Sequence, residues 1–168
     1  MQATGYTALS ATRIREDKGF YFDDFEADMV IEHMPGRTVI EADNSWQSLV
    51  AMNQHPLHID AEYARGTEFG RLLVSSLVTF AIVNGMTVHT VSQKAIANLG
   101  WDKVRLSAPV FIGDTLYAES EVLTKRLSAT RPGQGIVTVL TVGLNQRREQ
   151  VIRFKRTILL PLRQASEH

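Results

Sequence analysis

The pattern of apolar and polar residues changes along the chain from that of a helix to that of strands. Nine of the twelve residues from Leu72 to Val83 are apolar. A segment that is apolar on nearly every side predicts a buried helix, which we expect to continue to about Thr90. After Trp101, apolar residues recur at every second position, as in GIVTVLTVGLNQ and VIRFKRTILLPLR. This period of two predicts long strands.

Turn-forming residues separate these strands. They occur at Gly113-Asp114, at Pro132-Gly133 and in the polar cluster from Asn145 to Glu149. Three long antiparallel strands after one long buried helix predict an α+β protein, in which a sheet wraps around a central helix.

The first half of the chain predicts shorter elements. A short strand around Arg37–Ile40 leads into a helix, with Thr38 or Asp43 as its cap. The apolar face of this helix consists of Trp46, Leu49, Val50 and Met52. Pro56 cannot continue it, so NQHPLH predicts a turn, and AEYARGTEFG predicts a short helical segment capped by Asp60. We expect residues 1–19 to form an N-terminal arm and residues 20–168 a single domain.

Composition excludes several classes of function. The 18 Lys and Arg residues balance 18 Asp and Glu residues, so no overall basic field indicates a nucleic-acid partner. Cysteine is absent, which excludes disulfides and thiolate chemistry. The N-terminus has no apolar signal-peptide core, and no run approaches the ~20 apolar residues of a membrane span. We therefore expect a cytoplasmic protein with no membrane partner.

The balanced charge conceals an asymmetry. Residues 121–168 carry 9 Lys and Arg residues against 3 Glu residues. This basic segment is consistent with an anionic ligand such as a nucleotide-bearing cofactor. It is also consistent with alternating basic residues on the solvent-exposed face of strands, so composition alone leaves both interpretations open.

The stretch NQHPLHID, residues 53–60, is the candidate site. As a metal site, His55, His58 and Asp60 offer suitable ligands, but the proline prevents the helix that would align them. The serines at 75 and 76 lie outside any G-x-S-x-G elbow, which argues against a serine nucleophile. An imidazole held by a rigid proline turn can instead take a proton from water. The alternative is that His58 bonds a backbone carbonyl and only holds the turn in place.

NQHPLHID resembles the hydratase-2 signature of MaoC-like enoyl-CoA hydratases, whose usual form is G-D-x-N-P-x-H-x-D. The resemblance continues through Tyr63-Ala64, FGR at 69–71 and the buried helix to PVFIGDTL at 109–116, and it spans roughly residues 36–160. It implies a hot-dog fold and an acyl-CoA thioester as the substrate. It implies no metal and no cofactor, because coenzyme A is part of the substrate.

In that family, an imidazole and an aspartate activate one water, which adds across the double bond of a 2-enoyl thioester. The resemblance gives His58 the histidine role, and it gives the backbone N–H of Ser76 the role of holding the enolate oxygen. The usual aspartate is Asn53 here, and the usual asparagine is His55. Three possibilities follow: His58 is the only base and Asn53 positions the water, His55 is a second proton-transfer group, or only acyl-CoA binding survives.

The segments GRTVIEADNSW, TEFGRLLVSS, SQKAIANLGWDKVRL and GDTLYAESEVL resemble a MaoC subgroup that acts on itaconyl-, mesaconyl- or β-methylmalyl-CoA. Such a C5 dicarboxyl substrate has a free carboxylate that needs a cation. Arg71 is the first candidate, with an ion pair to Glu68 as its alternative role, and Arg105 is the second. We expect Gly85 to let a neighbouring backbone or the acyl chain approach the helix.

The candidates for the CoA phosphates are Lys125, Arg126 and Arg131, near predicted strand ends. Two other functions remain open. A hot-dog acyl-CoA thioesterase would need Glu68 or His55 against the thioester carbonyl, and a non-catalytic acyl-CoA binding protein would explain Asn53. Family members usually pair two hot-dog units, so a homodimer or a higher homo-oligomer is expected.

Overall fold

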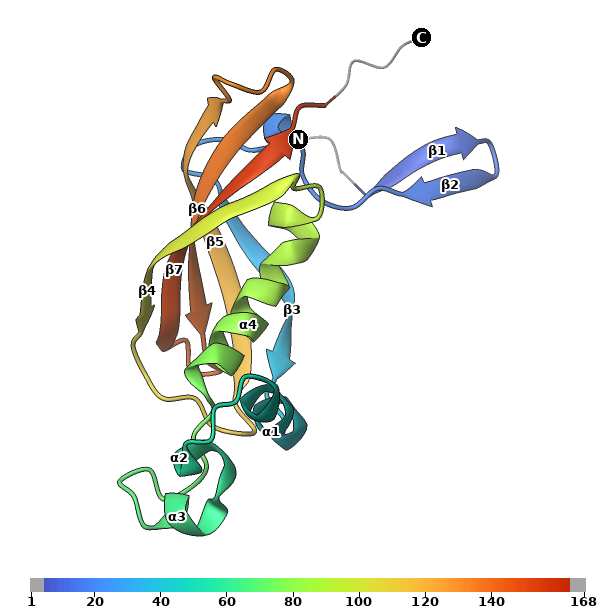
Figure 1. Ribbon diagram of the computed structural model, residues 1–168. Coiled ribbons are helices and arrows are strands. Elements are labelled where there is room, and N and C mark those ends of the chain that lie inside the picture. Colours follow the sequence, from blue (N-terminus) through green and yellow to red (C-terminus); the bar gives the residue numbers. More distant parts are fainter. Residues whose placement is uncertain (1–4, 164–168) are drawn as a thin grey trace.

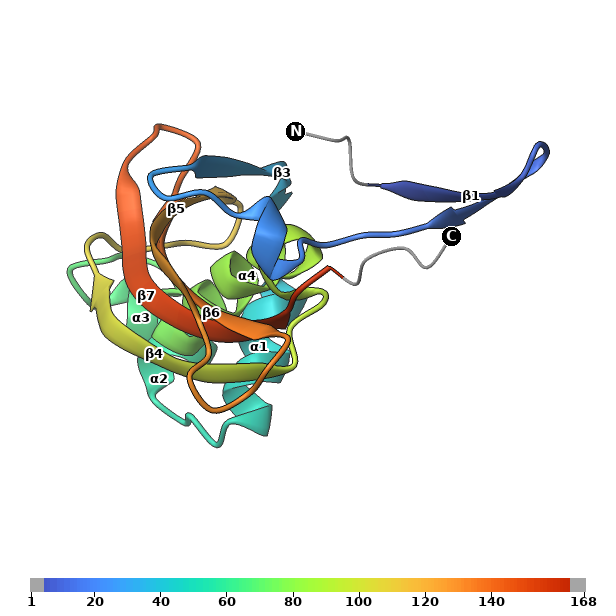
Figure 2. The ribbon, with the colours of Figure 1, turned by 90° about the horizontal axis from the view of Figure 1, so that it is seen from above.

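The computed structural model describes residues 5–163 and contains one main sheet. Its five antiparallel strands lie in the order β3-β5-β6-β7-β4 and curl around helix α4 (Figures 1 and 2). This is the hot-dog arrangement, so the α+β prediction is confirmed. The strands are β3 (Val30–Thr38), β4 (Ala97–Leu106), β5 (Thr115–Leu127), β6 (Gln134–Leu144) and β7 (Gln150–Pro161).

The helices lie in and beside the curl of the sheet. Helix α4 occupies its concave side, and the three short helices gather at the end where α4 begins (Figure 1). The helices are α1 (Glu41–Val50), α2 (Pro56–Ile59), α3 (Ala61–Arg65) and α4 (Ser76–Thr87), with short turns at Phe22–Asp24 and Val88–Ser92. The predicted buried helix therefore starts four residues later than expected. Residues 72–75 are extended instead, and the N–H of Val74 donates to the carbonyl of Val110 at 2.9 Å.

Helix α4 packs closely on β6, and Gly143 makes this possible. A Cβ atom at position 143 would lie 2.6 Å from Cγ2 of Ile152 and 2.8 Å from Cγ2 of Val83. Both distances are shorter than any real contact of a Cβ atom, so a larger residue would push α4 away from the sheet. Alternate residues of β5, beginning with Leu116 and Ala118, are buried beneath the same helix.

The predicted apolar face of α1 lies on the surface of the chain and not in its core. Trp46, Leu49, Val50 and Met52 are between 63% and 81% exposed, and the buried residues of α1 are polar. These buried residues are Asn44 and Ser48, one turn apart. The helix turns this polar face inward because Asn44 bonds to three backbone groups of neighbouring segments.

Other boundaries differ from the predictions. Strand β3 begins at Val30 rather than near Arg37, and four strands follow α4 rather than three, because β4 begins at Ala97. Of the two proposed caps of α1, the carboxylate of Asp43 accepts the N–H of Ile40 at 2.9 Å. Thr38 is a strand residue, and its hydroxyl bonds that of Thr115.

The N-terminal segment forms a hairpin of β1 (Tyr6–Ser10) and β2 (Arg13–Glu16). It projects away from the sheet in both views (Figures 1 and 2), and all nine strand residues are exposed. A lone two-stranded hairpin is at best marginally stable in water. The division at residue 19 between an N-terminal arm and a domain stays a prediction. Residues 1–4 of this arm lie outside the part of the chain that the structure describes.

His33 makes the stability of the fold depend on pH. It is buried, with Nε2 2.9 Å from Oγ of Ser120, whose hydroxyl in turn lies 2.8 Å from that of Thr141. Its Nδ1 is buried without a hydrogen-bond partner. Because burial penalises the charged ring, the pKa of His33 is lowered to about 4.

We expect the free energy of unfolding to fall as the pH drops from 7 toward 4. In this window the unfolded histidine binds a proton that the folded one resists, so protonation favours the unfolded state. At pH 5, His33 alone should cost about 2 kcal/mol. Urea unfolding at several pH values measures this cost. The His33→Gln variant, which does not titrate, should show a flatter profile, and an equally steep profile would contradict this account.

Candidate functional site

The segment between α1 and α4 is built from short capped turns. Pro56 begins α2, a position where its missing N–H costs nothing, and Nδ1 of His55 accepts the N–H of Leu57 at 3.2 Å. Oδ1 of Asp60 then accepts two N–H groups of α3 at 3.0 Å each, so its predicted capping role is confirmed. These caps fix the backbone on both sides of His58.

His58 is held in the tautomer that a general base needs. Its Nδ1 lies 2.9 Å from the carbonyl oxygen of Leu73, and its side chain is half-buried. A carbonyl oxygen can only accept, so Nδ1 carries the hydrogen, and Nε2 of the neutral ring keeps a lone pair. The same contact therefore holds the turn in place and leaves Nε2 able to accept a proton, so the two roles considered from the sequence are compatible.

Asn53 lies beside the start of α4. Its Nδ2 donates to Oγ of Ser75, the residue that precedes the helix, at 3.2 Å. His55 is exposed, and its ring centre lies 5.8 Å from that of His58. Because Nδ1 of His55 accepts a hydrogen bond, the hydrogen of its neutral ring lies on Nε2. The structure thus brings Asn53, His55 and His58 together.

Asn44 is a site residue that the sequence did not indicate. It is fully buried, and its Nδ2 donates to the carbonyls of His58 at 2.8 Å and Leu73 at 3.3 Å. Its Oδ1 accepts the N–H of Ser75 at 2.9 Å. One side chain therefore ties the histidine turn to the start of α4. The only available signal was its i, i+4 spacing from Ser48 on α1.

The predicted oxyanion donor, Ser76, lines a cavity of about 290 Å³ at the start of α4. Its N–H belongs to the first helical turn, whose N–H groups have no partner within the helix. The other lining residues are Phe69, Leu73, Val74, Thr79, Leu106, Ser107, Ala108, Pro109 and Val110. His58 and Asn53 lie outside this lining. His58 contacts the lining residue Leu73, and Asn53 contacts Ser75, which directly precedes Ser76.

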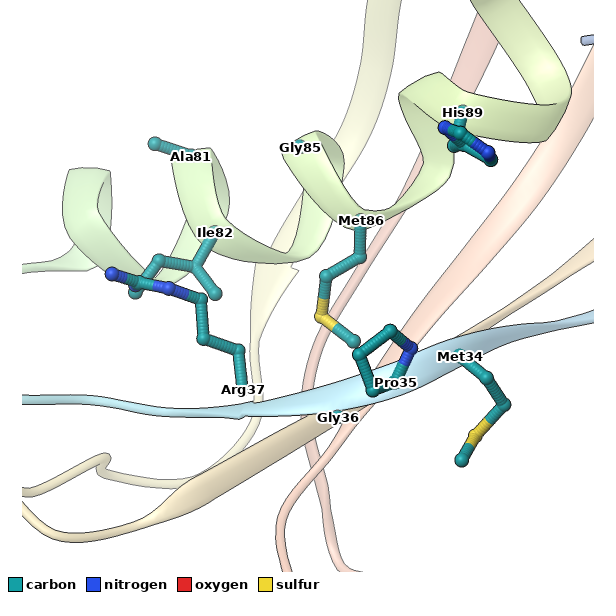
Figure 3. A pocket seen from close by; sticks show the side chains of 9 residues that line it. All are labelled: Met34, Pro35, Gly36, Arg37, Ala81, Ile82, Gly85, Met86 and His89. Carbon is teal, nitrogen blue, oxygen red and sulfur yellow. The ribbon is translucent and has the colours of Figure 1, made fainter. Parts of the chain in front are cut away.

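Gly85 lines a second and larger cavity, of about 660 Å³, between α4 and β3 (Figure 3). No atom lies within 4 Å of the position that a Cβ would take there, so Gly85 opens space beside the helix. Arg37 lies in the same cavity, but its guanidinium pairs with Asp43 at 2.7 Å. Partial burial acts to raise the pKa of Asp43, and hydrogen bonds from Arg37 and from the N–H of Ile40 hold it below its ordinary value. Ser76 does not line this cavity.

The two arginines proposed for a substrate carboxylate lie in different places. Arg71 is exposed, its guanidinium lies 3.9 Å above the ring of Phe111, and no ion pair joins it to Glu68 in the described chain. Phe111 in turn contacts Phe69 of the Ser76 cavity at 6.4 Å between ring centres. Arg105 lines a separate cavity with other basic residues.

The three residues proposed for the CoA phosphates lie far from His58. Lys125 donates to the carbonyl of Phe25, and Arg126 and Arg131 lie near the hairpin between β5 and β6. Ten residues of extended strand separate Arg126 from Leu116 near the start of β5, which is roughly 33 Å. The structure therefore does not bring these three residues to the site of the same chain.

Two features are absent from residues 5–163: a metal-binding cluster and a helix that could span a membrane. That range contains no group of three histidine or acidic side chains placed to hold a metal ion. Its helices are too short or too polar to cross a membrane.

Comparisons with known proteins converge on one family. The sequence model of the mesaconyl-CoA hydratase family matches residues 2–168. The chain is 33% identical over 147 residues to a mesaconyl-CoA hydratase of Cereibacter sphaeroides, covering 88% of this chain and 43% of that protein. It is also 33% identical over 147 residues to a β-methylmalyl-CoA dehydratase of Chloroflexus aurantiacus, covering 87% of this chain and 41% of that protein.

A solved structure agrees with these similarities. A putative MaoC domain protein dehydratase from Chloroflexus aurantiacus superimposes with a TM-score of 0.83 and 31% identity. The match covers 96% of this chain and 44% of that one. The chain thus spans less than half the length of these three relatives.

Proposed function

Since the chain belongs to the mesaconyl-CoA hydratase family, we propose that it adds water to, or removes it from, a branched C5 dicarboxyl-CoA thioester. The observation that carries this proposal is the tautomer of His58, whose basic Nε2 is fixed next to the start of α4. A base for water and a helix N-terminus for an anion are the two groups that hydration of an enoyl thioester needs.

In the proposed reaction, Nε2 of His58 takes a proton from water while the water oxygen bonds to C3 of the enoyl group. The electron pair of the double bond moves toward the thioester oxygen, and the N–H of Ser76 stabilises the enolate. The imidazolium then returns the proton to C2, which restores the base and leaves one water added. Dehydration follows the same steps in reverse and consumes no other reactant.

Asn53 positions the water in this scheme. Its Nδ2 donates to Ser75, and its Oδ1 accepts the N–H of His55 at 3.4 Å and keeps a second lone pair that can accept a hydrogen of the water. An amide cannot take a proton at neutral pH, so it orients the water without acting as a base. His55 is the alternative second proton-transfer group, supported by its nearby ring and its hydrogen on Nε2.

We propose Arg71 as the partner of the free carboxylate. Stacking on Phe111 uses the face of the guanidinium and leaves its edge N–H groups available for a bidentate contact. We expect Arg71→Met to raise KM for mesaconyl-CoA about tenfold or more. KM for crotonyl-CoA should stay unchanged, because crotonyl-CoA has no free carboxylate. Steady-state kinetics with both substrates measure the difference, and equal losses on both would assign Arg71 a structural role.

A panel of thioesters tests the function against its two alternatives. Mesaconyl-, itaconyl- and crotonyl-CoA would be offered with a thiol reagent present. A hydratase consumes the enoyl absorbance and releases no thiol, whereas a thioesterase using Glu68 or His55 releases free CoA. A protein that binds these esters without turning any of them over would be the non-catalytic binding protein.

We propose that the chain works as a homodimer or a higher homo-oligomer. The sheet ends in two edge strands, β3 and β4, and the exposed apolar residues of α1 include Trp46 and Val50. Unpaired edges and apolar patches are the features that association covers. Light scattering should give at least twice the chain mass of 18.8 kDa, and a value near 18.8 kDa would contradict the proposal.

A further inference from the structure

Four basic side chains surround one cavity of about 370 Å³. They are Lys103 and Arg105 of β4 and Arg153 and Lys155 of β7, with Leu140 of β6 as the remaining lining residue. Phe154 and Arg156 of β7 contact α4, and successive strand residues point to opposite faces. The cavity therefore lies on the face of the sheet turned away from α4.

This arrangement brings like charges close together. Arg105 and Arg153 stand directly opposite each other on neighbouring strands, where equal charges destabilise a sheet. No ion pair between described residues involves any of the four cations. Asp102 of β4 stands directly opposite Lys155, although no ion pair among the described residues joins them. The other acidic residues on this face, Glu119 and Glu121 of β5, are separated from β7 by β6, roughly 10 Å away.

The backbone of β4 is distorted at the same place. The pairing of β4 with β7 shifts between Asp102 and Arg105, and Lys103 within this bulge has a φ of 53°. Non-glycine residues rarely adopt such a left-handed conformation, which costs free energy. Repulsion and strain are thus combined at one cavity, and a bound anion would offset the repulsion.

We propose that this cavity binds a phosphate-bearing polyanion. A single carboxylate would neutralise only one of the four cations. A nucleotide with two or more phosphates carries enough negative charge to neutralise most or all of them. The two guanidinium groups suit phosphate because each can donate two parallel hydrogen bonds. Two sources share this chemistry: the nucleotide end of a CoA thioester, and a free nucleotide.

The first source rests on the proposed function. Strand β4 supplies Arg105 to this cavity and its last residue, Leu106, to the cavity of Ser76, which Ser107 just beyond the strand also lines. One strand thus contributes to both the catalytic and the cationic cavity. If the nucleotide end of the substrate binds here, the cationic cavity is a second anchor for the substrate, distinct from the groups that act on its acyl end.

Calorimetric titration of the full chain with adenosine 3′,5′-bisphosphate tests the proposal. We expect binding that weakens with added salt and that falls about tenfold or more in an Arg153→Gln/Lys155→Gln variant. An Arg13→Gln/Arg15→Gln variant carries the same change in net charge on the exposed N-terminal hairpin and should bind as the wild type does. Without ligand, the melting temperature of the first variant should stay the same or rise, because the repulsion among the basic side chains of the cavity is reduced.

No binding to the wild type, or equal loss in both variants, would overturn the proposal. When binding follows the prediction, KM values for mesaconyl-CoA and for its shorter pantetheine thioester identify the source. A rise for the CoA ester alone in the first variant assigns the substrate nucleotide, and no rise assigns a free nucleotide. A wild type that binds the bisphosphate and turns over no thioester would refute the proposed function and leave this site standing.

Discussion

Replacing His58 with glutamine is expected to lower the rate of hydration by about 10²–10⁴-fold while the protein stays folded. The amide of glutamine can still donate to the carbonyl of Leu73, the contact that His58 makes through Nδ1 at 2.9 Å. It cannot take a proton from water. The variant therefore keeps the contact that holds the turn and removes the base. Steady-state rates with mesaconyl-CoA, together with the melting temperature, measure the two effects separately.

Two matched variants sharpen this result. His58→Ala should lose activity to the same extent and also lose stability, because the carbonyl of Leu73 then keeps only its longer hydrogen bond, from Asn44 at 3.3 Å. His55→Ala changes the other histidine of the turn and distinguishes the two arrangements of proton transfer. A small effect at His55 supports His58 as the only base, and a large one supports a second proton-transfer group. Full activity of His58→Gln would mean that His58 only holds the turn.

Replacing Asn44 with alanine should be the most destabilising single change at the site. The side chain satisfies the N–H of Ser75 and the carbonyls of His58 and Leu73, and it is fully buried. An unsatisfied buried polar group costs about 1–3 kcal/mol, so the loss should reach roughly 3 kcal/mol or more. Urea unfolding measures it. The activity of the folded fraction should also fall, because the turn and the helix start lose their fixed spacing.

Controls distinguish this role from general damage to α1. Gln47→Ala alters an exposed residue of the same helix and should leave stability and activity nearly unchanged. Asn44→Asp keeps the acceptor for Ser75 but loses both donors, so it should lower kcat more than it raises KM. A stable and fully active Asn44→Ala protein would show that the turn and the helix start are positioned without it.

The sequence was most informative where local chemistry decides the structure. Pro56 begins α2 and Asp60 caps α3, and both effects depend only on residues that are close in the sequence. The strand pattern after α4 and the turns at Gly113 and Gly133 also predicted the sheet well. His58 was proposed from its motif, and the structure adds its tautomer, with the hydrogen on Nδ1 and the lone pair on Nε2.

The sequence was least informative where partners are distant along the chain. Asn44 bonds to residues 14 to 31 positions away, and no spacing rule indicates such contacts. Its burial also turns the apolar face of α1 outward, because Asn44 forms hydrogen bonds to backbone groups that the pattern of apolar residues does not reveal. Arg71 is a similar case, since its stacking on Phe111 depends on the approach of two separate loops.

The most direct test of the central claim uses mesaconyl-CoA in water enriched in heavy oxygen. If the chain hydrates this thioester, mass spectrometry should find one heavy oxygen in a β-methylmalyl-CoA product, with no free CoA formed and with no product from His58→Gln. Unchanged mesaconyl-CoA, or heavy oxygen found only in a free acid released together with CoA, would contradict the account.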